Sequence, residues 1–277
     1  MAEARMGMPG VVRPRSMRRG LGWLLLASLA GFALLGPLLI SHDPIAQDLS
    51  LSLAPPDARH WLGTDVLGRS VLARLAEATR LSVGLAWLAA LTAAVPGVLL
   101  GVLAAWRGGR VDAVLQLLSD AVMSMPGLLL VLLMATLAPG QGWALYTGLS
   151  LVLWVEFFRV TRVTSRPVLS GEAVEASRLL GLGMGHVLRH HVAAALGPVL
   201  GTLLAFATAQ AVLATAALGF ISVGLQPPTP ELGLMMTEFL PYYHEAPWLM
   251  AGPVAVLAWL VLGMMCLVPT AGEEVGS

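Results

Sequence analysis

Long apolar stretches, separated by short polar connections, run through most of the chain. The hydrocarbon core of a bilayer is about 30 Å thick, so a helix needs roughly 20 mainly apolar residues to cross it. Six stretches are candidates for such spans, and they cover residues 21–40, 80–106, 113–138, 142–158, 193–223 and 247–268. The pattern therefore predicts an all-α integral membrane protein with six transmembrane helices.

The third stretch starts with polar residues. Asp112, Gln116, Ser119 and Asp120 fall within about two helical turns of one another. We therefore expect an interfacial helix here, which enters the membrane near Met123.

The polar segments between the spans set the expected domain organisation. The divisions are a tail over residues 1–20, a first transmembrane helix over 21–40, an external segment over 41–79, a five-helix core over 80–268 and a second tail over 269–277. Within the core, residues 159–192 form a polar excursion that is longer than a simple connection between two helices requires.

The composition supports placement in a membrane and limits the chemistry. Hydrophobic residues make up 57% of the chain, charged residues 12%, and the mean hydropathy is +0.80, far from the balance of a soluble domain. All 16 basic residues are arginines. A phosphate-binding loop needs a lysine to reach the β and γ phosphates, so the chain cannot hydrolyse nucleotide by itself.

Two further counts exclude other classes of function. Cys266 is the only cysteine, which excludes intrachain disulfides and cysteine-rich metal sites. The formal net charge is zero, whereas a nucleic-acid partner requires a basic surface.

The distribution of arginines predicts the orientation of the chain, because short cytoplasmic loops keep an excess of positive charge. With the N-terminus inside, 12 of the 16 arginines are cytoplasmic and the external ones are Arg59, Arg69, Arg74 and Arg80. The last external loop, residues 224–246, contains glutamates and no arginine. We therefore expect a multi-pass protein with both termini in the cytoplasm.

The first external segment, 41–79, ends in a helical pattern. From Ser70 onwards, apolar residues recur at helical spacing, while Arg69, Arg74 and Glu77 occupy the other face. This arrangement predicts an amphipathic helix lying at the membrane surface.

The polar excursion over residues 159–192 also has internal order. A helical pattern begins at Glu172, glycines interrupt it from Gly181 to Gly185, and the pattern resumes at His186. The pattern predicts a helix, a glycine turn and a second helix beneath the membrane. Together they would form a protruding surface that a partner protein can bind.

The order Glu175, Ala176, Ser177, three further residues and Gly181 resembles the EAA loop of ABC importer permeases, whose coupling helix docks into a cleft of the ATPase subunit. The resemblance implies an ATPase-coupling role for Glu172, Glu175, Ala176, Ser177 and Gly181. The chain departs from the family pattern after the loop, where two alanines replace a common Leu-Pro pair.

Two other segments narrow the resemblance. HWLGTDVLGRSVLARL at 60–75 and ALGFISVGLQPPTPELGLMM at 217–236 are similar to signatures of the C-type permease in dipeptide, oligopeptide and nickel importers. The likeness covers residues 15–268, and the C-terminal sequence CLVPTAGEEVGS departs from the family. It implies a type I ABC importer permease fold in a bacterial inner membrane.

The resemblance also implies a set of partners. These are a second permease that completes a heterodimeric pore, two cytoplasmic ATPase subunits, and a periplasmic or lipid-anchored substrate-binding protein. ATP and Mg would be used by the partner subunits, and we expect no catalytic residue and no bound cofactor in this chain.

Candidates for the substrate path are Asp120, Glu231, Glu238 and His244. Asp120 either lines the path or is solvated at a helix end. The other three lie in the last external loop, where they either contact substrate or form a solvated rim that docks a partner. His186 and His190 have the i, i+4 spacing of paired metal ligands, but the alternative is a pair of loop histidines near the ATPase, and no metal ligand is assigned.

The cargo is expected to be nickel or a related transition metal, carried as a small-molecule chelate. DARHWLGTD at 57–65, the Thr79–Arg80 pair and ASRL at 176–179 look closer to nickel-import permeases, with di- or oligopeptides as the alternative.

An intramembrane enzyme, a secondary carrier and a purely structural subunit are the competing classes. An enzyme would need a set of catalytic residues inside the spans, and none is visible in the sequence. A secondary carrier works without an ATPase, so it would have no use for a loop that docks onto one.

Overall fold

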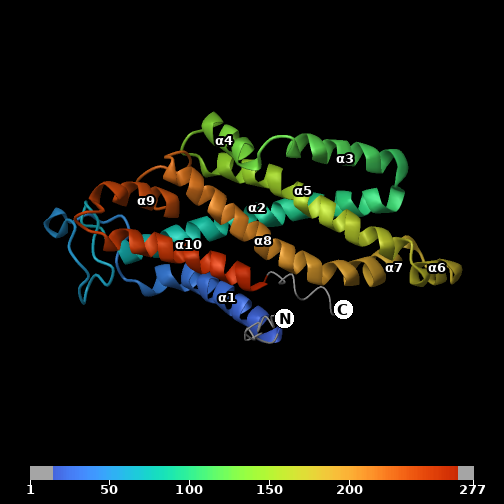
Figure 1. Cartoon of the computed structure of the whole chain (residues 1–277), viewed down its shortest axis with the longest axis horizontal. Coiled ribbons are helices and arrows are strands. Elements are labelled where there is room, and N and C mark those ends of the chain that lie inside the picture. The colour runs from blue at the N-terminus through green and yellow to red at the C-terminus, as the bar shows by residue number, and fades with distance from the viewer. Residues whose placement is uncertain (1–14, 268–277) are drawn as a thin grey trace, which may run out of the picture.

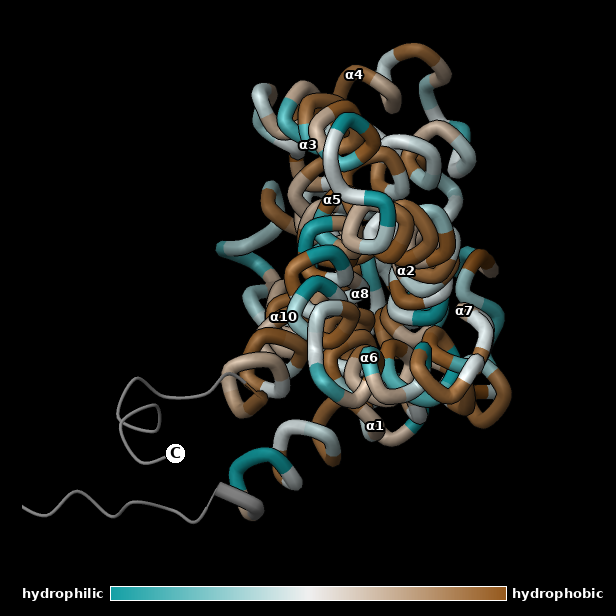
Figure 2. The backbone as a smooth tube through the Cα atoms, turned by 90° about the vertical axis from the view of Figure 1, so that its right-hand side faces the viewer, coloured by the Kyte–Doolittle hydropathy of each residue, from teal (hydrophilic) through white to brown (hydrophobic). Residues whose placement is uncertain are grey.

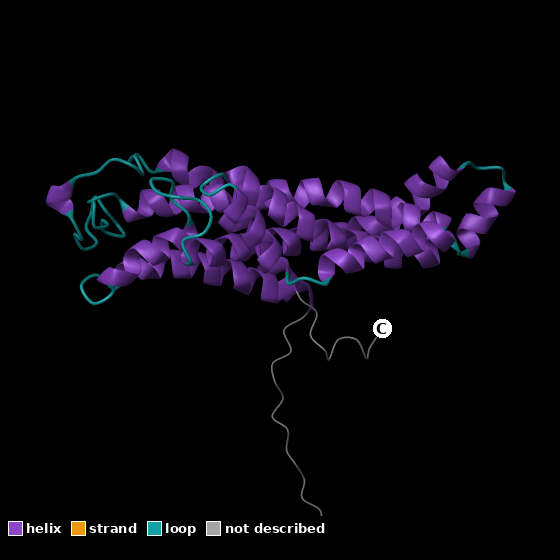
Figure 3. Cartoon of the chain, turned by 90° about the horizontal axis from the view of Figure 1, so that it is seen from above, coloured by secondary structure: helices purple, strands orange, loops and turns teal. Residues whose placement is uncertain are grey.

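The structure is a computed structural model, which describes residues 15–267. Those residues form an elongated helical bundle (Figures 1 and 3) in which no β-strand occurs. In chain order the elements are α1 (Arg15–Leu39), the 3-10 helix η1 (Leu49–Leu51), α2 (Val71–Arg107), α3 (Gly109–Met123), α4 (Gly127–Leu137), α5 (Gly142–Leu169), α6 (Glu172–Leu179), α7 (Met184–Val187), the π-helical turn η2 (Leu188–Val192), α8 (Ala193–Phe220), α9 (Leu232–Phe239), the 3-10 helix η3 (Leu240–Tyr242) and α10 (Trp248–Leu267).

The long helices run side by side, and the bundle has two distinct ends. Helices α6 and α7 lie at one end, and α9 with the segment between α1 and α2 lies at the other (Figure 1). We call these the α6 end and the α9 end. The core pairs α2 with α5, α2 with α8 and α1 with α10. Figure 2 looks along the bundle, and brown, hydrophobic turns recur in its helices, as helices that cross a bilayer require.

The prediction of an all-α membrane fold is confirmed. Five helical stretches are long and apolar enough to cross a membrane, and they contain α1, α2, α5, α8 and α10. Helices α3 and α4, which cover the third predicted stretch, are bent by 74° at the break between them and form either a broken span or a re-entrant loop. The third stretch is therefore a broken pair, and the break follows Met123 because Pro126, the N-cap of α4, has no N–H to continue the helix.

The expectation of a surface helix over residues 70–79 was wrong. Ser70 caps α2, which then runs without interruption to Arg107. The predicted boundary between residues 79 and 80 therefore lies inside one helix. The supposed polar face is buried, since Arg74 is only 1% exposed, and carboxylates from other segments neutralise that face.

Helix α5 is longer than the predicted span, which ended at residue 158. It continues to Leu169, and Arg159, Arg162 and Arg166 follow one another along the added turns. Asp112 on α3 binds Arg162 and, at 2.8 Å, Arg166. The arginines thus have carboxylate partners on a neighbouring helix, which allows the helix to extend.

Small residues bring α2 and α5 into close contact. A Cβ atom added at Gly97 would lie 2.5 Å from Cβ of Phe157, and one added at Gly101 would lie 2.7 Å from Cβ of Thr161. Buried alanines at positions 86, 89, 90 and 93 continue the same helix. Stripes of small residues are the usual way in which membrane helices approach each other.

Candidate coupling site and transport path

Helix α6 at the α6 end has one buried side and one exposed side. Val174 is 1% exposed and packs in a small apolar cluster with Leu169, Val187, Val192 and Leu196. The cluster joins the end of α5, the turn before α8 and α6 itself. It fixes α6 against the bundle.

Ser177 provides a polar attachment on the same buried side. Its Oγ atom donates to the carbonyl of Ala173 at 2.9 Å and lies 3.0 Å from Nε2 of His191, which belongs to η2. The hydroxyl therefore links α6 to η2, which continues directly into α8.

The turn after α6 depends on Gly181. Its N–H donates to the carbonyl of Arg178 at 3.0 Å, and the N–H of Leu182 donates to the carbonyl of Ser177 at 3.0 Å. These are the two hydrogen bonds of a Schellman motif, with Gly181 in its left-handed position at φ +77°. The predicted turn at Gly181 is found, but the second helix begins at Met184, so Gly185 lies inside it and not in the turn.

The outer side of α6 is available to a partner. Glu172, Glu175 and Ala176 are exposed, and the side chains of Leu179 and Leu180 are 85% and 78% exposed. Leu179 and Leu180 thus form an exposed apolar pair directly after Arg178 at this end of the bundle.

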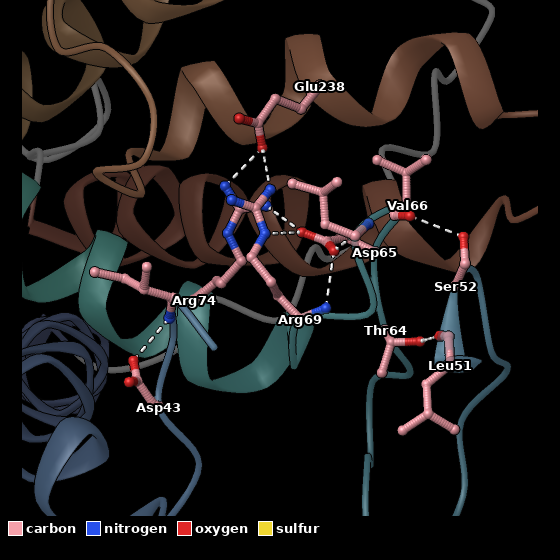
Figure 4. A network of polar contacts seen from close by, with 11 residues as sticks. Asp43, Leu51, Ser52, Thr64, Asp65, Val66, Arg69, Arg74 and Glu238 are labelled. Atoms are coloured by element: carbon pink, nitrogen blue, oxygen red, sulfur yellow. Dashed lines mark hydrogen bonds and ion pairs between the residues drawn. The ribbon is translucent and has the colours of Figure 1, made fainter. Parts of the chain in front are cut away.

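An ion-pair cluster organises the α9 end (Figure 4). Oδ2 of Asp65 lies 2.7 Å from Nε of Arg69 and 2.6 Å from Nη1 of Arg74. Oε2 of Glu238 lies 2.6 Å from Nη2 of Arg74 and 3.4 Å from Nη2 of Arg69. The cluster ties α2 and the segment between α1 and α2 to α9, so Glu238, proposed from the sequence as a path residue, is engaged within the chain.

Glu231 does not lie on a solvated rim of the last external loop, where it was expected. It is 2% exposed and caps α9, where Oε2 accepts from the N–H of Leu234 at 2.8 Å. Burial raises the pKa of the Glu231 carboxyl. The expected rim position was wrong because the capping requirement of α9 draws this side chain inward.

The other two path candidates, His244 and Asp120, have neighbours other than Glu231 and Glu238. His244 is exposed next to Tyr243. Asp120 is 67% exposed and pairs with Arg159 of α5 at 2.7 Å. Among the described residues, no hydrogen bond or ion pair joins any two of these four candidates.

The histidine pair has the predicted geometry without a third ligand. The rings of His186 and His190 stack with centroids 4.1 Å apart. Among residues 15–267, no group of three or more His, Cys, Asp or Glu side chains is placed to hold a metal ion.

The sequence analysis missed Glu156. This residue lies in the middle of α5 and is partly exposed. The signal was present, since a charged residue inside an apolar span is a functional candidate by default. The predicted end of the span at residue 158 had placed Glu156 close to the membrane surface.

Comparisons with known proteins agree with this architecture. Residues 97–269 match the family described as "Binding-protein-dependent transport system inner membrane component". The di/tripeptide transport system permease protein DppC of Pseudomonas aeruginosa (strain UCBPP-PA14) is 35% identical over 255 residues, which cover 88% of this chain and 83% of the relative. The nickel transport system permease protein NikC of Escherichia coli (strain K12) is 32% identical over 248 residues, covering 88% and 90%.

Proposed function

Since the chain belongs to the family of inner membrane components of binding-protein-dependent transport systems, we propose that it forms one half of a heterodimeric pore in a bacterial inner membrane. The chain is a permease subunit of an ABC importer and is not an enzyme. In the proposed orientation, the α9 end faces the substrate-binding protein, and the α6 end and both termini face the cytoplasm.

The single observation that supports this function best is the construction of α6. Its leucine tip is exposed, whereas Val174 and Ser177 attach its other side to the bundle. An ATPase subunit that holds Leu179 and Leu180 would therefore move the start of α8 when it closes on ATP. Two such ATPase subunits use ATP and Mg, and this chain binds no cofactor of its own.

The experiment is purification of the whole importer with the tip changed. Leu179→Asp with Leu180→Asp should remove the exposed apolar pair, so the ATPase subunits should no longer copurify with the permeases and uptake should fall at least tenfold. Ser170→Asp, which adds a carboxylate at an exposed position just before α6, is the matched control and should keep both. Normal assembly and uptake with the double change would refute the coupling role.

For the cargo we propose a short peptide. Peptide and nickel permeases are similar to this chain at nearly the same identity. The expectation of a metal cargo relied on the likeness of residues 57–65, Thr79–Arg80 and 176–179 to nickel permeases, whereas the relatives are mostly named as peptide permeases. Two carboxylates of the acidic last loop, Glu231 and Glu238, are engaged within the chain. A nickel or related metal chelate is the second candidate, supported by the relative named as a nickel permease.

Uptake assays in cells distinguish between a peptide cargo and a metal-chelate cargo. Deletion of the gene for this chain should reduce accumulation of a labelled dipeptide, and a plasmid copy should restore it. If the deletion instead reduces accumulation of labelled nickel and leaves dipeptide uptake unchanged, the cargo is the metal chelate and not the peptide.

A further inference from the structure

A small cavity lies where α2, α5 and α8 meet the residue that caps α9. Three polar side chains line it, and they come from three different segments: Ser82 from α2, Thr215 from α8 and Glu231 from the N-cap of α9. Four leucines form the rest of the lining. The three polar residues are at most 4% exposed, so the cavity is polar on one side and shielded from bulk water.

Two polar atoms at the cavity have no hydrogen-bond partner among residues 15–267. They are Oγ of Ser82 and Oε1 of Glu231. The carboxyl is held in place by its other oxygen, since Oε2 accepts from the N–H of Leu234 at 2.8 Å and lies 2.0 Å from where a Cβ atom at Gly219 would be. A buried polar atom without a partner is costly, so both atoms require a ligand in the cavity.

The size of the cavity and its number of oxygens decide what that ligand is. The space for the centre of a water-sized molecule is about 10 Å³. A sphere of that volume is about 2.7 Å across, roughly the spacing of two hydrogen-bonded oxygens, so the space takes one molecule. A buried water commonly has about three polar partners, whereas calcium and magnesium ions take six or more oxygens. Three side-chain oxygens therefore suit a water.

We propose that this cavity binds one water molecule, which joins α2, α8 and the N-cap of α9. The hydroxyl of Thr215 donates to the carbonyl of Val212 at 2.9 Å, so its oxygen accepts a hydrogen bond from the water. The hydroxyl of Ser82 donates to the water. Burial raises the pKa of the Glu231 carboxyl, and the protonated Oε1 provides the second donor.

This arrangement satisfies every polar group at the cavity. A water molecule has two hydrogens to donate and two lone pairs to accept with, and the three contacts use one hydrogen and both lone pairs. The water would connect α9, which carries Glu238 of the ion-pair cluster, to two of the long core helices.

The direct test is a structure of the purified complex that contains this chain, at a resolution where other internal waters are visible. One density peak should lie within about 2.6–3.2 Å of Oγ of Ser82, Oγ1 of Thr215 and Oε1 of Glu231. A cavity without a peak at that resolution overturns the proposal. A peak with six oxygens at about 2.0–2.6 Å would identify a bound cation and overturns it too.

The sign of the change in Tm for Ser82→Ala gives a second test. In a dry cavity the variant removes an unsatisfied hydroxyl, so the Tm would rise. With the water bound it removes a hydrogen-bond partner, so the Tm should fall by about 2–4 °C. An unchanged or higher Tm overturns the site. The control Ser28→Ala is exposed on α1, where the hydroxyl bonds the carbonyl of Leu25 in its own helix, and should not lower the Tm by more than about 1 °C.

A change of salt distinguishes the water from a monovalent cation. The Tm of the wild-type complex should be the same in sodium chloride and in choline chloride at equal ionic strength. A higher Tm in sodium that Ser82→Ala abolishes would assign the cavity to a sodium ion and overturn the water. The density and the salt comparison both use the wild-type chain, so they decide the question even if Ser82→Ala does not assemble.

Discussion

Nη2 of Arg74 on α2 lies 2.6 Å from Oε2 of Glu238 on α9, which joins residues 164 positions apart in the sequence. Arg74 and Asp65 are each 1% exposed, so the cluster around them is shielded from water. A buried arginine requires its carboxylate partners, because an unpaired buried charge costs several kcal/mol. The cluster therefore holds α2, α9 and the segment between α1 and α2 as one unit.

The first prediction concerns Asp65→Asn. The change leaves Arg69 and Arg74 with Glu238 as their remaining carboxylate, so the free energy of unfolding should fall by about 3–5 kcal/mol. Denaturation of the detergent-solubilised complex measures it. Asp57→Asn, in the same segment but with a side chain 57% exposed, should be close to wild type, and equal losses in both variants would contradict the buried cluster.

The second prediction concerns the turn after α6. Gly181 has φ +77°, whereas Gly183 has φ −70°, and a Cβ atom at either position would meet nothing within 4 Å. Valine is strained in the left-handed region by about 1–2 kcal/mol or more, so Gly181→Val should distort the turn and lower ATP-dependent uptake severalfold. Gly183→Val should retain uptake, and a similar loss in the two variants would show that the backbone conformation at Gly181 is not the cause.

A third prediction tests the contact between α2 and α5. A Cβ atom at Gly97 would lie 2.7 Å from the backbone oxygen of Trp154, while one at Gly84 would meet nothing within 4 Å. Gly97→Ala should lower the free energy of unfolding by about 1–3 kcal/mol through overpacking. Gly84→Ala, on the same helix, should raise it by about 0.5–1 kcal/mol. Thermal unfolding in detergent measures both changes, which should have opposite signs. A stabilising effect of Gly97→Ala would refute the close approach of α2 to α5.

A fourth prediction follows from Glu231. Burial raises its pKa above the ordinary value of 4.5, so the folded chain binds this proton more tightly than the unfolded chain. The associated stability is fully present below about pH 4.5 and is lost as the pH rises through the folded pKa. Oε1 has no hydrogen-bond partner among the described residues, which suits a protonated carboxyl.

Glu231→Gln tests this assignment, since the amide keeps an oxygen for the N–H of Leu234. The variant should lose the part of the pH dependence of Tm that lies above pH 4.5. A pH profile parallel to that of the wild type would show that Glu231 is ionised in the folded protein.

The fifth prediction is the topology. Ser52 and Ser170 are exposed at the α9 end and the α6 end respectively. In a chain with Cys266 replaced by serine, Ser52→Cys should react with an impermeant maleimide from the periplasmic side and Ser170→Cys only after the membrane is opened. Labelling of both from the same side would overturn the proposed orientation.

The membrane class, the six apolar stretches and the position of Gly181 were determined by the sequence alone. Each depends on a local property. Hydropathy summed over about 20 residues identifies a span, and a glycine after an amphipathic run identifies a helix end. The bend after Met123 was not predicted, although Pro126 marks it in the sequence.

Only the tertiary structure decided what each charge does. Arg74, Glu231 and Glu238 were expected at a surface but lie inside or within an ion-pair cluster, while Glu156 moved from a predicted membrane boundary to the interior of α5. The physical reason is that the cost of burying a charge depends on its partners. Those partners come from segments far apart in the chain, so no local pattern can predict them.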